Sequence, residues 1–383
     1  MGTAGGQGVL TGVDVLARDG FALLRGLRVG LVTNPTGRTQ AGQATADVLW
    51  NAPGVYLRAL FGPEHGIRGD YDQPLVDDGT DSATGLPAYS LYGARTAPSA
   101  EQLAGIDCLV FDIADVGCRF YTYISTLGHV LEAADAHGLP VFVLDRPNPI
   151  TGTHCEGPLP DGDKLSFTAY HSLPVRHGLT VGEVARLMHA ECGLACPLTV
   201  VPCEGWYRGD WYDRTGLLWT NPSPNMRSLA QATLYPGVGL LEMTNVSVGR
   251  GTDTPFEIVG APWLDGRGLA SHVNAQDLPG VRAVPVEFTP TASVHMGVLC
   301  EGVNLLVTDR GVFDSVRLGL TLGIALRALY PQEWQAEKFK TLLANRAVFD
   351  GVMAGRSYEE VAAMWAGDLA EFGRRVQPHL LYE

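Results

Sequence analysis

Short runs of consecutive apolar residues alternate with helix-patterned stretches through the first half of this 383-residue chain. The runs are rich in β-branched residues and too short for helices, which is typical of strands buried on both faces. They cover residues 27–33, 55–61, 108–113, 141–144 and 198–201. Helices are indicated at 43–50, 121–137 and 180–189, the last with Thr180 and Glu183 as a capping box. This alternation predicts an open, parallel, Rossmann-like sheet.

A proline-rich segment at residues 219–225 interrupts the alternation. Beyond it, strands and helices follow one another without regular order. Strands are predicted at 284–288 and 303–308, and helices near 315–329, 335–343 and 358–372. We therefore predict an α/β protein with a Rossmann-like catalytic domain at 10–218 and a smaller α+β domain at 219–383.

The composition is that of a globular protein, with 46% hydrophobic and 18% charged residues. The formal net charge is −14, which disfavours nucleic acid and anionic membranes as partners. No stretch approaches the roughly 18 consecutive apolar residues of a membrane span. The first residues lack the basic and apolar regions of a signal peptide, so we expect a cytoplasmic protein unless a leader has been removed.

Common cofactor and nucleophile motifs are absent from the sequence. No GxGxxG follows the first predicted strand, and no GxxxxGK(S/T) or GxSxG occurs, which disfavours nicotinamide, P-loop and serine-hydrolase chemistry. The seven cysteines are scattered, and Cys192, Cys196 and Cys203 have neither a CxxC pair nor a nearby His. We expect reduced thiols, no metal site and no cofactor.

Polar loops shaped by Gly and Pro follow four of the predicted strands, and three of these loops carry both an acid and an arginine. Ligands of open parallel sheets bind beyond the carboxyl ends of the strands, so we predict a site where these loops meet. Glu64 is the strongest catalytic candidate, because Pro and Gly restrict the backbone around it and a fixed carboxylate can act as acid, base or nucleophile. Glu64 could instead cap a turn or pair with Arg68. Asp112 and Asp115 are candidates for a second catalytic carboxylate, although an acid that ends an apolar strand often braces a loop.

Seven sequence blocks carry a family resemblance. They are TNPTG at 33–37, LFGPEHG at 60–66, SLYG at 90–93, RFYTY at 119–123, LDRPNP at 144–149, PSPNM at 222–226 and GRGT at 249–252. In this order, from about residue 12 to the C-terminal Leu-Leu-Tyr, the chain resembles the exo-β-N-acetylmuramidase family of exo-acting peptidoglycan hexosaminidases. Two departures are Ala114, where that family's pattern has Gln, and Thr151, where it has Gly. Ala114 lacks a possible hydrogen bond to the sugar.

The resemblance implies a Rossmann-like domain and a smaller C-terminal domain, with an active cleft between them and Glu64 as the catalytic glutamate. It implies hydrolysis of the β-1,4 bond of a non-reducing-end N-acetylmuramic acid unit in peptidoglycan fragments, in cell wall turnover and recycling. The second catalytic group stays open among Asp112, Asp115, Asp145 and the 2-acetamido group of the substrate. A non-catalytic two-lobed protein that binds muropeptides or sugar acids is the alternative, although the acid-rich loops do not suit an anionic ligand. The sequence does not indicate an oligomeric state.

Substrate-binding candidates come from these loops and blocks. They are Asn34, His65, Arg68, Asp145, Arg146, Asn148, His177, Asn225 and Arg250. His177 could equally pack beneath a pocket, Asp145 could form a structural pair with Arg146, and the tryptophans at 206, 211 and 219 could stack on a sugar or fill the core.

The lactyl ether of N-acetylmuramic acid carries a carboxylate, which an acidic protein must bind with a local cation. Arg68, Arg146 and Arg250 are the candidates. Arg250 is preferred, since its glycine-flanked segment at 247–252 could close over a bound anion.

Overall fold

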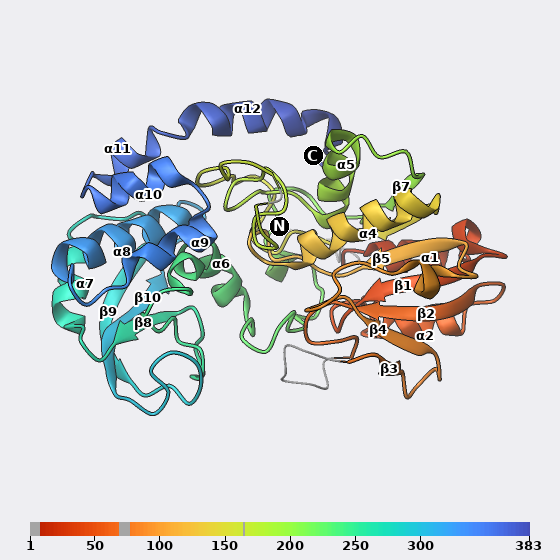
Figure 1. Cartoon of the computed structure of the whole chain (residues 1–383), viewed down its shortest axis with the longest axis horizontal. Helices are drawn as coiled ribbons and strands as arrows, with labels where there is room; N and C mark the ends of the chain where they lie inside the picture. The colour runs from red at the N-terminus through yellow and green to blue at the C-terminus, as the bar shows by residue number, and fades with distance from the viewer. Residues whose placement is uncertain (1–7, 69–76, 164) are drawn as a thin grey trace, which may run out of the picture.

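A computed structural model describes residues 8–68, 77–163 and 165–383. The first domain is built on a seven-stranded sheet (Figure 1). Its strands are β1 (Arg28–Thr33), β2 (Tyr56–Gly62), β3 (Gly79–Thr80), β4 (Pro87–Ser90), β5 (Cys108–Asp112), β6 (Val141–Leu144) and β7 (Leu198–Val201). Their order is β3-β4-β2-β1-β5-β6-β7, and every pair is parallel except β3 with β4. The Rossmann-like sheet is therefore confirmed.

Helices cover both faces of this sheet, which explains why its central strands read as continuous apolar runs. On β1, Val29 and Leu31 join one cluster of the core and Val32 joins another, because successive side chains point to opposite faces. The first cluster includes α1 (Gly12–Arg18) and α2 (Thr45–Trp50), and the second includes α4 (Tyr123–His137) and α5 (Val181–Glu191). A short helix, α3 (Ala100–Leu103), precedes β5.

Two helix ends follow the local sequence signals. Thr180 caps α5 by accepting a hydrogen bond from the backbone N–H of Glu183, and the Glu183 carboxylate accepts one from the Thr180 N–H in return. Gly138 ends α4 with a φ of 64°, a left-handed conformation that glycine adopts without steric cost.

The second domain combines a small sheet with helices. Its antiparallel strands β8 (Ile258–Ala261), β9 (Val281–Phe288) and β10 (Cys300–Val307) are ordered β8-β10-β9. Its helices are α6 (Leu229–Val238), α7 (Gly266–Asn274), α8 (Ser315–Leu329), α9 (Lys340–Leu343), α10 (Arg346–Met353), α11 (Tyr358–Ala362) and α12 (Ala366–Val376). The single helix predicted at 358–372 is wrong, because the chain leaves helical conformation between α11 and α12. Helix α6 packs against α8 and so belongs to this part of the chain, and the domain boundary at 218/219 stays a prediction.

The two domains are fixed to each other. Arg119 is 1% exposed, and its guanidinium donates to the carbonyls of Pro158 and Leu173 in one domain and of Leu342 and Leu343 in the other, at 2.8–3.2 Å. Helix α12 then runs along the top of the molecule back toward α5 (Figure 1). Beyond it, the Tyr382 hydroxyl donates to Asp145 at 2.5 Å.

None of the helices within the described ranges is long and apolar enough to cross a membrane.

Candidate active site

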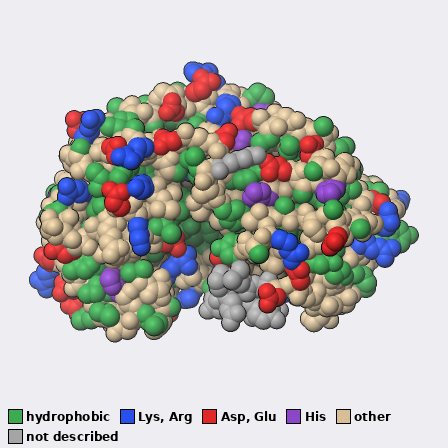
Figure 2. Space-filling view, in the orientation of Figure 1, with side chains coloured by type: hydrophobic (Ala, Val, Ile, Leu, Met, Phe, Trp, Pro, Cys, Tyr) green, Lys and Arg blue, Asp and Glu red, His purple; other side chains and the backbone are tan. Residues whose placement is uncertain are grey.

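A cavity of about 700 Å³ lies at the carboxyl edge of the first sheet. Its wall includes Thr36 after β1, His65 after β2, Asp115 after β5 and Arg146 after β6, together with residues of the segment 217–224. The four polar loops therefore meet at one edge, as the strand pattern predicts. In the space-filling view, the surface is hollowed between the two lobes (Figure 2).

Glu64 sits in a strained turn after β2. His65 and Gly66 have φ values of 69° and 75°, and a left-handed conformation is uncommon for a residue with a side chain such as His65. The Glu64 side chain is 24% exposed, and its Oε1 lies 3.9 Å from Nε2 of His65, which lines the cavity. Arg68 does not pair with Glu64, because its guanidinium donates to Asp47 and Asp81 at 2.5–3.3 Å. The turn therefore presents a partly accessible carboxylate beside the cavity.

Two tyrosines, Tyr92 and Tyr123, lie close enough to Glu64 to feel its charge. Burial, followed by the adjacent Glu64 carboxylate, raises the pKa of Tyr92 to about 12. The same two causes raise the pKa of Tyr123, whose hydroxyl donates to the carbonyl of Pro222. Tyr121 packs edge-on against Tyr123, with ring centroids 4.9 Å apart, so the aromatic block 119–123 packs behind Glu64 as part of the core. The sequence blocks contain these tyrosines, but nothing in the pattern indicated which of them accompany Glu64.

A second carboxylate comes from the other domain. Glu242 follows α6, its side chain is 18% exposed, and it forms an ion pair with Nη2 of Arg250. Burial raises the pKa of Glu242, Arg250 lowers it, and Glu64 lies close enough to raise it further. Glu64 and Glu242 therefore interact across the junction of the domains. Sequence reasoning missed Glu242, although a signal was present, since it is the only charged residue between Arg227 and Arg250.

Arg250 lies in a tight turn between two glycines. Gly249 and Gly251 flank it with φ values of 79° and 80°, and a Cβ on Gly251 would lie 2.3 Å from the backbone nitrogen of Ala292. Its guanidinium also lies over the ring of Phe256, 5.5 Å from the centroid. The predicted cationic segment is thus folded against its own domain with Arg250 directed at Glu242.

Two predicted acids, Asp112 and Asp145, face inward and are not part of the cavity wall. Asp112 is 0% exposed, and its carboxylate accepts hydrogen bonds from Arg146 at 2.6 and 2.9 Å and from Thr45 at 2.5 Å. Asp145 is also 0% exposed and accepts from Thr180, Tyr382 and two backbone N–H groups at 2.5–2.9 Å. Burial raises the pKa of Asp145 to about 6 despite these donors. Both acids brace loops of the sheet edge.

Asp115 is the one of these predicted acids that lines the cavity. Its Oδ2 accepts from the Gly117 N–H at 2.6 Å and lies 3.1 Å from Nε2 of His177. His177 is 0% exposed and packs beneath the cavity rather than lining it, as one of its two predicted alternatives states.

Three predicted asparagines are not part of the cavity wall. Asn34 is buried, and its Oδ1 accepts from the N–H and hydroxyl of Thr36 at 2.9 and 2.5 Å. Asn148 is buried, and its Nδ2 donates to the carbonyl of Leu179 at 2.9 Å. Asn225 is half-buried in the proline-rich segment. Asn34 and Asn148 fix loop conformations.

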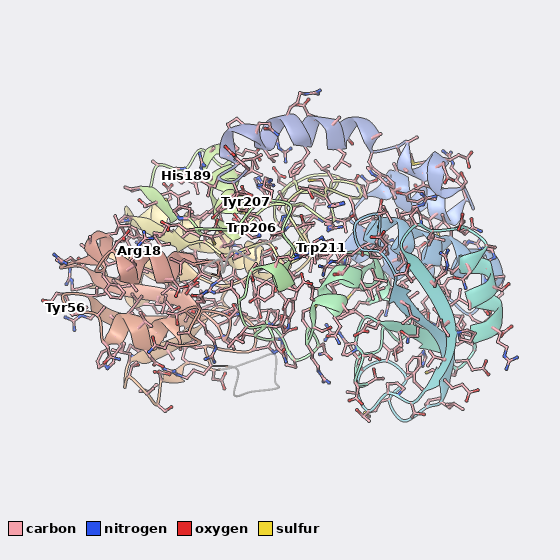
Figure 3. The ribbon with its side chains drawn as sticks, turned by 180° about the vertical axis from the view of Figure 1, so that it is seen from behind. Arg18, Tyr56, His189, Trp206, Tyr207 and Trp211 are labelled. Carbon is pink, nitrogen blue, oxygen red and sulfur yellow. The ribbon has the colours of Figure 1, made fainter. Side chains whose placement is uncertain are left out.

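The tryptophans divide between the two predicted roles. Trp206 and Trp211 are buried, and both come from the stretch of chain that follows β7 (Figure 3). Trp219 lines the cavity, where it packs edge-on against Tyr212 with ring centroids 5.2 Å apart. Trp219 therefore offers an aromatic face for a sugar.

No group of three or more His, Cys, Asp or Glu residues able to hold a metal ion occurs among the described residues. The chemistry available at this cleft is that of three carboxylates (Glu64, Asp115 and Glu242), His65, phenols and guanidinium groups.

The chain matches two family models along nearly its whole length. The model of exo-beta-N-acetylmuramidase NamZ, N-terminal, covers residues 29–230, and that of NamZ, C-terminal, covers 233–382. The peptidoglycan beta-N-acetylmuramidase NamZ of Bacillus subtilis (strain 168) is 42% identical over 378 residues, which cover 98% of this chain and 91% of that protein.

Two crystal structures of DUF1343 family proteins from Bacteroides fragilis NCTC 9343 share the fold. They superpose with TM-scores of 0.91 and 0.80, at 37% and 28% sequence identity. In each case the match covers 98% of this chain and 99% of the other.

Proposed function

This chain belongs to the exo-beta-N-acetylmuramidase NamZ family, and from that membership we propose that it removes N-acetylmuramic acid from the non-reducing ends of peptidoglycan fragments. The reaction is hydrolysis of a β-1,4-glycosidic bond. The bond between the anomeric carbon and the leaving oxygen breaks, water supplies oxygen to the anomeric carbon, and a proton ends on the leaving oxygen. Such activity serves cell wall turnover and recycling.

The observation that carries the chemical part of this proposal is the pair Glu64 and Glu242. Glycosidases typically place two carboxyl groups on either side of the scissile bond. Glu64 lies at the cavity edge of the first domain, and Glu242 interacts with it from the second domain. Asp112 and Asp145 cannot take either part, since both carboxylates are fully buried.

We assign the general acid role to Glu64. The leaving oxygen of a sugar needs a proton as the bond breaks, and a carboxylic acid beside the cavity can supply it. Tyr92 and His65 flank Glu64, and they restrict where its carboxyl group can point.

We assign the second role, action of an ionised carboxylate at the anomeric carbon, to Glu242. Arg250 bonds to one of its oxygens and holds the side chain in place. Asp115 remains a candidate for a sugar-binding acceptor in the cavity wall, because its other carboxylate oxygen has no hydrogen-bond partner among the described residues.

Turnover of defined muramides tests the function. Purified protein is incubated with the disaccharide N-acetylmuramyl-β-1,4-N-acetylglucosamine and with the inverse disaccharide that has N-acetylglucosamine at its non-reducing end. We expect both monosaccharides from the first compound and none from the second, as seen by mass spectrometry. Saturable binding of the first compound without any hydrolysis would instead identify the two-lobed binding protein.

A further inference from the structure

The arginines around the cavity and cleft differ in whether their charge is compensated. Three of them have carboxylate partners. These are Arg68 with Asp47 and Asp81, Arg146 with Asp112, and Arg250 with Glu242. An ion pair that already neutralises a guanidinium reduces its attraction for a further anion.

Arg38 lies in the same cavity wall without a carboxylate partner among the described residues. Its Nε and Nη1 donate to the carbonyls of Pro35 and Gly42, both at 2.9 Å. These bonds hold the half-buried side chain in place but leave its positive charge uncompensated and its Nη2 without a hydrogen-bond partner among these residues.

The loop that carries Arg38 is tightly packed. A Cβ on Gly37 would lie 2.1 Å from Oγ1 of Thr33 and 2.8 Å from the carbonyl oxygen of Asp112, so only glycine allows this approach to the neighbouring strand. Nη2 of Arg146 donates to the backbone carbonyl oxygen of Arg38 at 2.8 Å, so the Arg146 side chain contacts the loop that carries Arg38. Nη1 of Arg146 is not engaged by any described residue either, so two donors remain in one part of the wall.

We propose that Arg38 binds the carboxylate of the lactyl ether on the terminal sugar and so determines the preference for muramic acid over glucosamine. The proposal rests on the proposed function. A protein of net charge −14 that leaves a positioned guanidinium uncompensated in its cavity is suited to an anionic group. The lactyl carboxylate is the group in which the two sugars differ in charge.

Arg250 is less suited to this task than the sequence suggests. It holds Glu242, and a second carboxylate on the same guanidinium would compete with that contact. Arg68 is less suited still, since its guanidinium bridges two aspartates.

A cycle of protein and substrate variants tests the proposal. The substrates are 4-nitrophenyl β-N-acetylmuramide and its analogue in which the lactyl carboxylate is a carboxamide. We expect Arg38→Ala to lower kcat/KM for the muramide about 10- to 100-fold, the range of a charge-assisted hydrogen bond, and to change the carboxamide little. Arg38→Lys should retain part of the discrimination, because it keeps the charge without the planar fork.

Arg58→Ala is the matched control, since Arg58 is an exposed arginine on β2 that lies over the ring of Tyr56. This variant should leave the ratio of the kcat/KM values for the two substrates unchanged. A loss of equal size on both substrates in the Arg38 variants would overturn the proposal. If Arg38→Ala does not fold, the test uses the ratio of kcat/KM for the muramide to kcat/KM for the carboxamide in the wild type and in Arg38→Lys. Equal wild-type values for the two substrates also overturn the proposal. A wild-type protein that hydrolyses neither compound would refute the proposed function instead.

Discussion

Replacing Glu64 with Gln should separate acid catalysis from binding. Gln keeps the shape of the side chain and a carbonyl oxygen that can accept from the neighbouring Tyr92, but it has no proton to give to the leaving oxygen. General acid catalysis contributes about 10²- to 10⁴-fold, so turnover of the natural disaccharide should fall by at least that factor. At about 1.4 kcal/mol per tenfold, this is a loss of roughly 3–5 kcal/mol of transition-state stabilisation.

The structure limits what else this substitution can change. Glu64 is partly exposed, and Arg68 is held by other acids, so no buried ion pair is broken. We therefore expect a change in unfolding free energy within about 0.5 kcal/mol and little change in KM.

The assay compares two leaving groups. Kinetics are measured on the disaccharide and on 4-nitrophenyl β-N-acetylmuramide, whose nitrophenolate departs with little need of a proton. The nitrophenyl glycoside should lose much less activity than the disaccharide. Near-normal turnover of the disaccharide would show that Glu64 is structural. An equal loss on both substrates would assign Glu64 to the second role and make Glu242 the candidate acid.

Three further perturbations test other parts of the molecule. Glu242→Gln should lower turnover of both substrates by a similar factor of at least about 10². The reason is that it removes a negative charge needed at the anomeric carbon, whichever leaving group departs. A loss confined to the disaccharide would contradict that role. Burial, followed by the nearby Glu156 carboxylate, raises the pKa of Asp314 to about 7. The folded state therefore binds this proton more tightly than the unfolded state, and the free energy of unfolding should fall as the pH rises from about 4 to about 7. Asp314→Asn keeps an N-cap for α8 and should flatten that fall in chemical denaturation across the same pH range, whereas an unchanged slope would reject the assignment. Dialysis against a chelator should leave muramidase activity intact, and activity lost and then restored by zinc or magnesium would refute a metal-free mechanism.

The sheet could be predicted from the sequence because its strands are buried on both faces. Val29, Leu31 and Val32 need apolar neighbours on opposite sides, and such runs have few other structural solutions. The parallel order then placed the loops after these strands at one edge, where the cavity lies.

The direction of a side chain at a strand end was not predictable in the same way. Asp112 ends β5 and Asp115 lies three residues later in the following loop, yet the first binds Arg146 inside the protein and the second lines the cavity. Which acid turns inward depends on partners such as Thr45, and no local pattern specifies those partners. Arg38 and Glu242 could not be singled out from the sequence for a related reason. The importance of each depends on its neighbours in the folded protein, which the local sequence does not specify.

Because the two proposed catalytic carboxylates, Glu64 and Glu242, belong to different domains, the proposed mechanism makes the orientation of the domains part of the catalytic geometry. A displacement of about 1 Å between reacting groups can cost about 100-fold in rate, so the joint must be rigid. Arg119 meets this need with hydrogen bonds to carbonyls of both domains, and it stays protonated at neutral pH, because burial lowers its pKa only to about 10. The chain end reinforces the joint, since Tyr382 returns to Asp145. On the proposed mechanism, the buried aspartate after β6 therefore has an indirect part, because it anchors the C-terminal segment that helps to fix the orientation of the two domains.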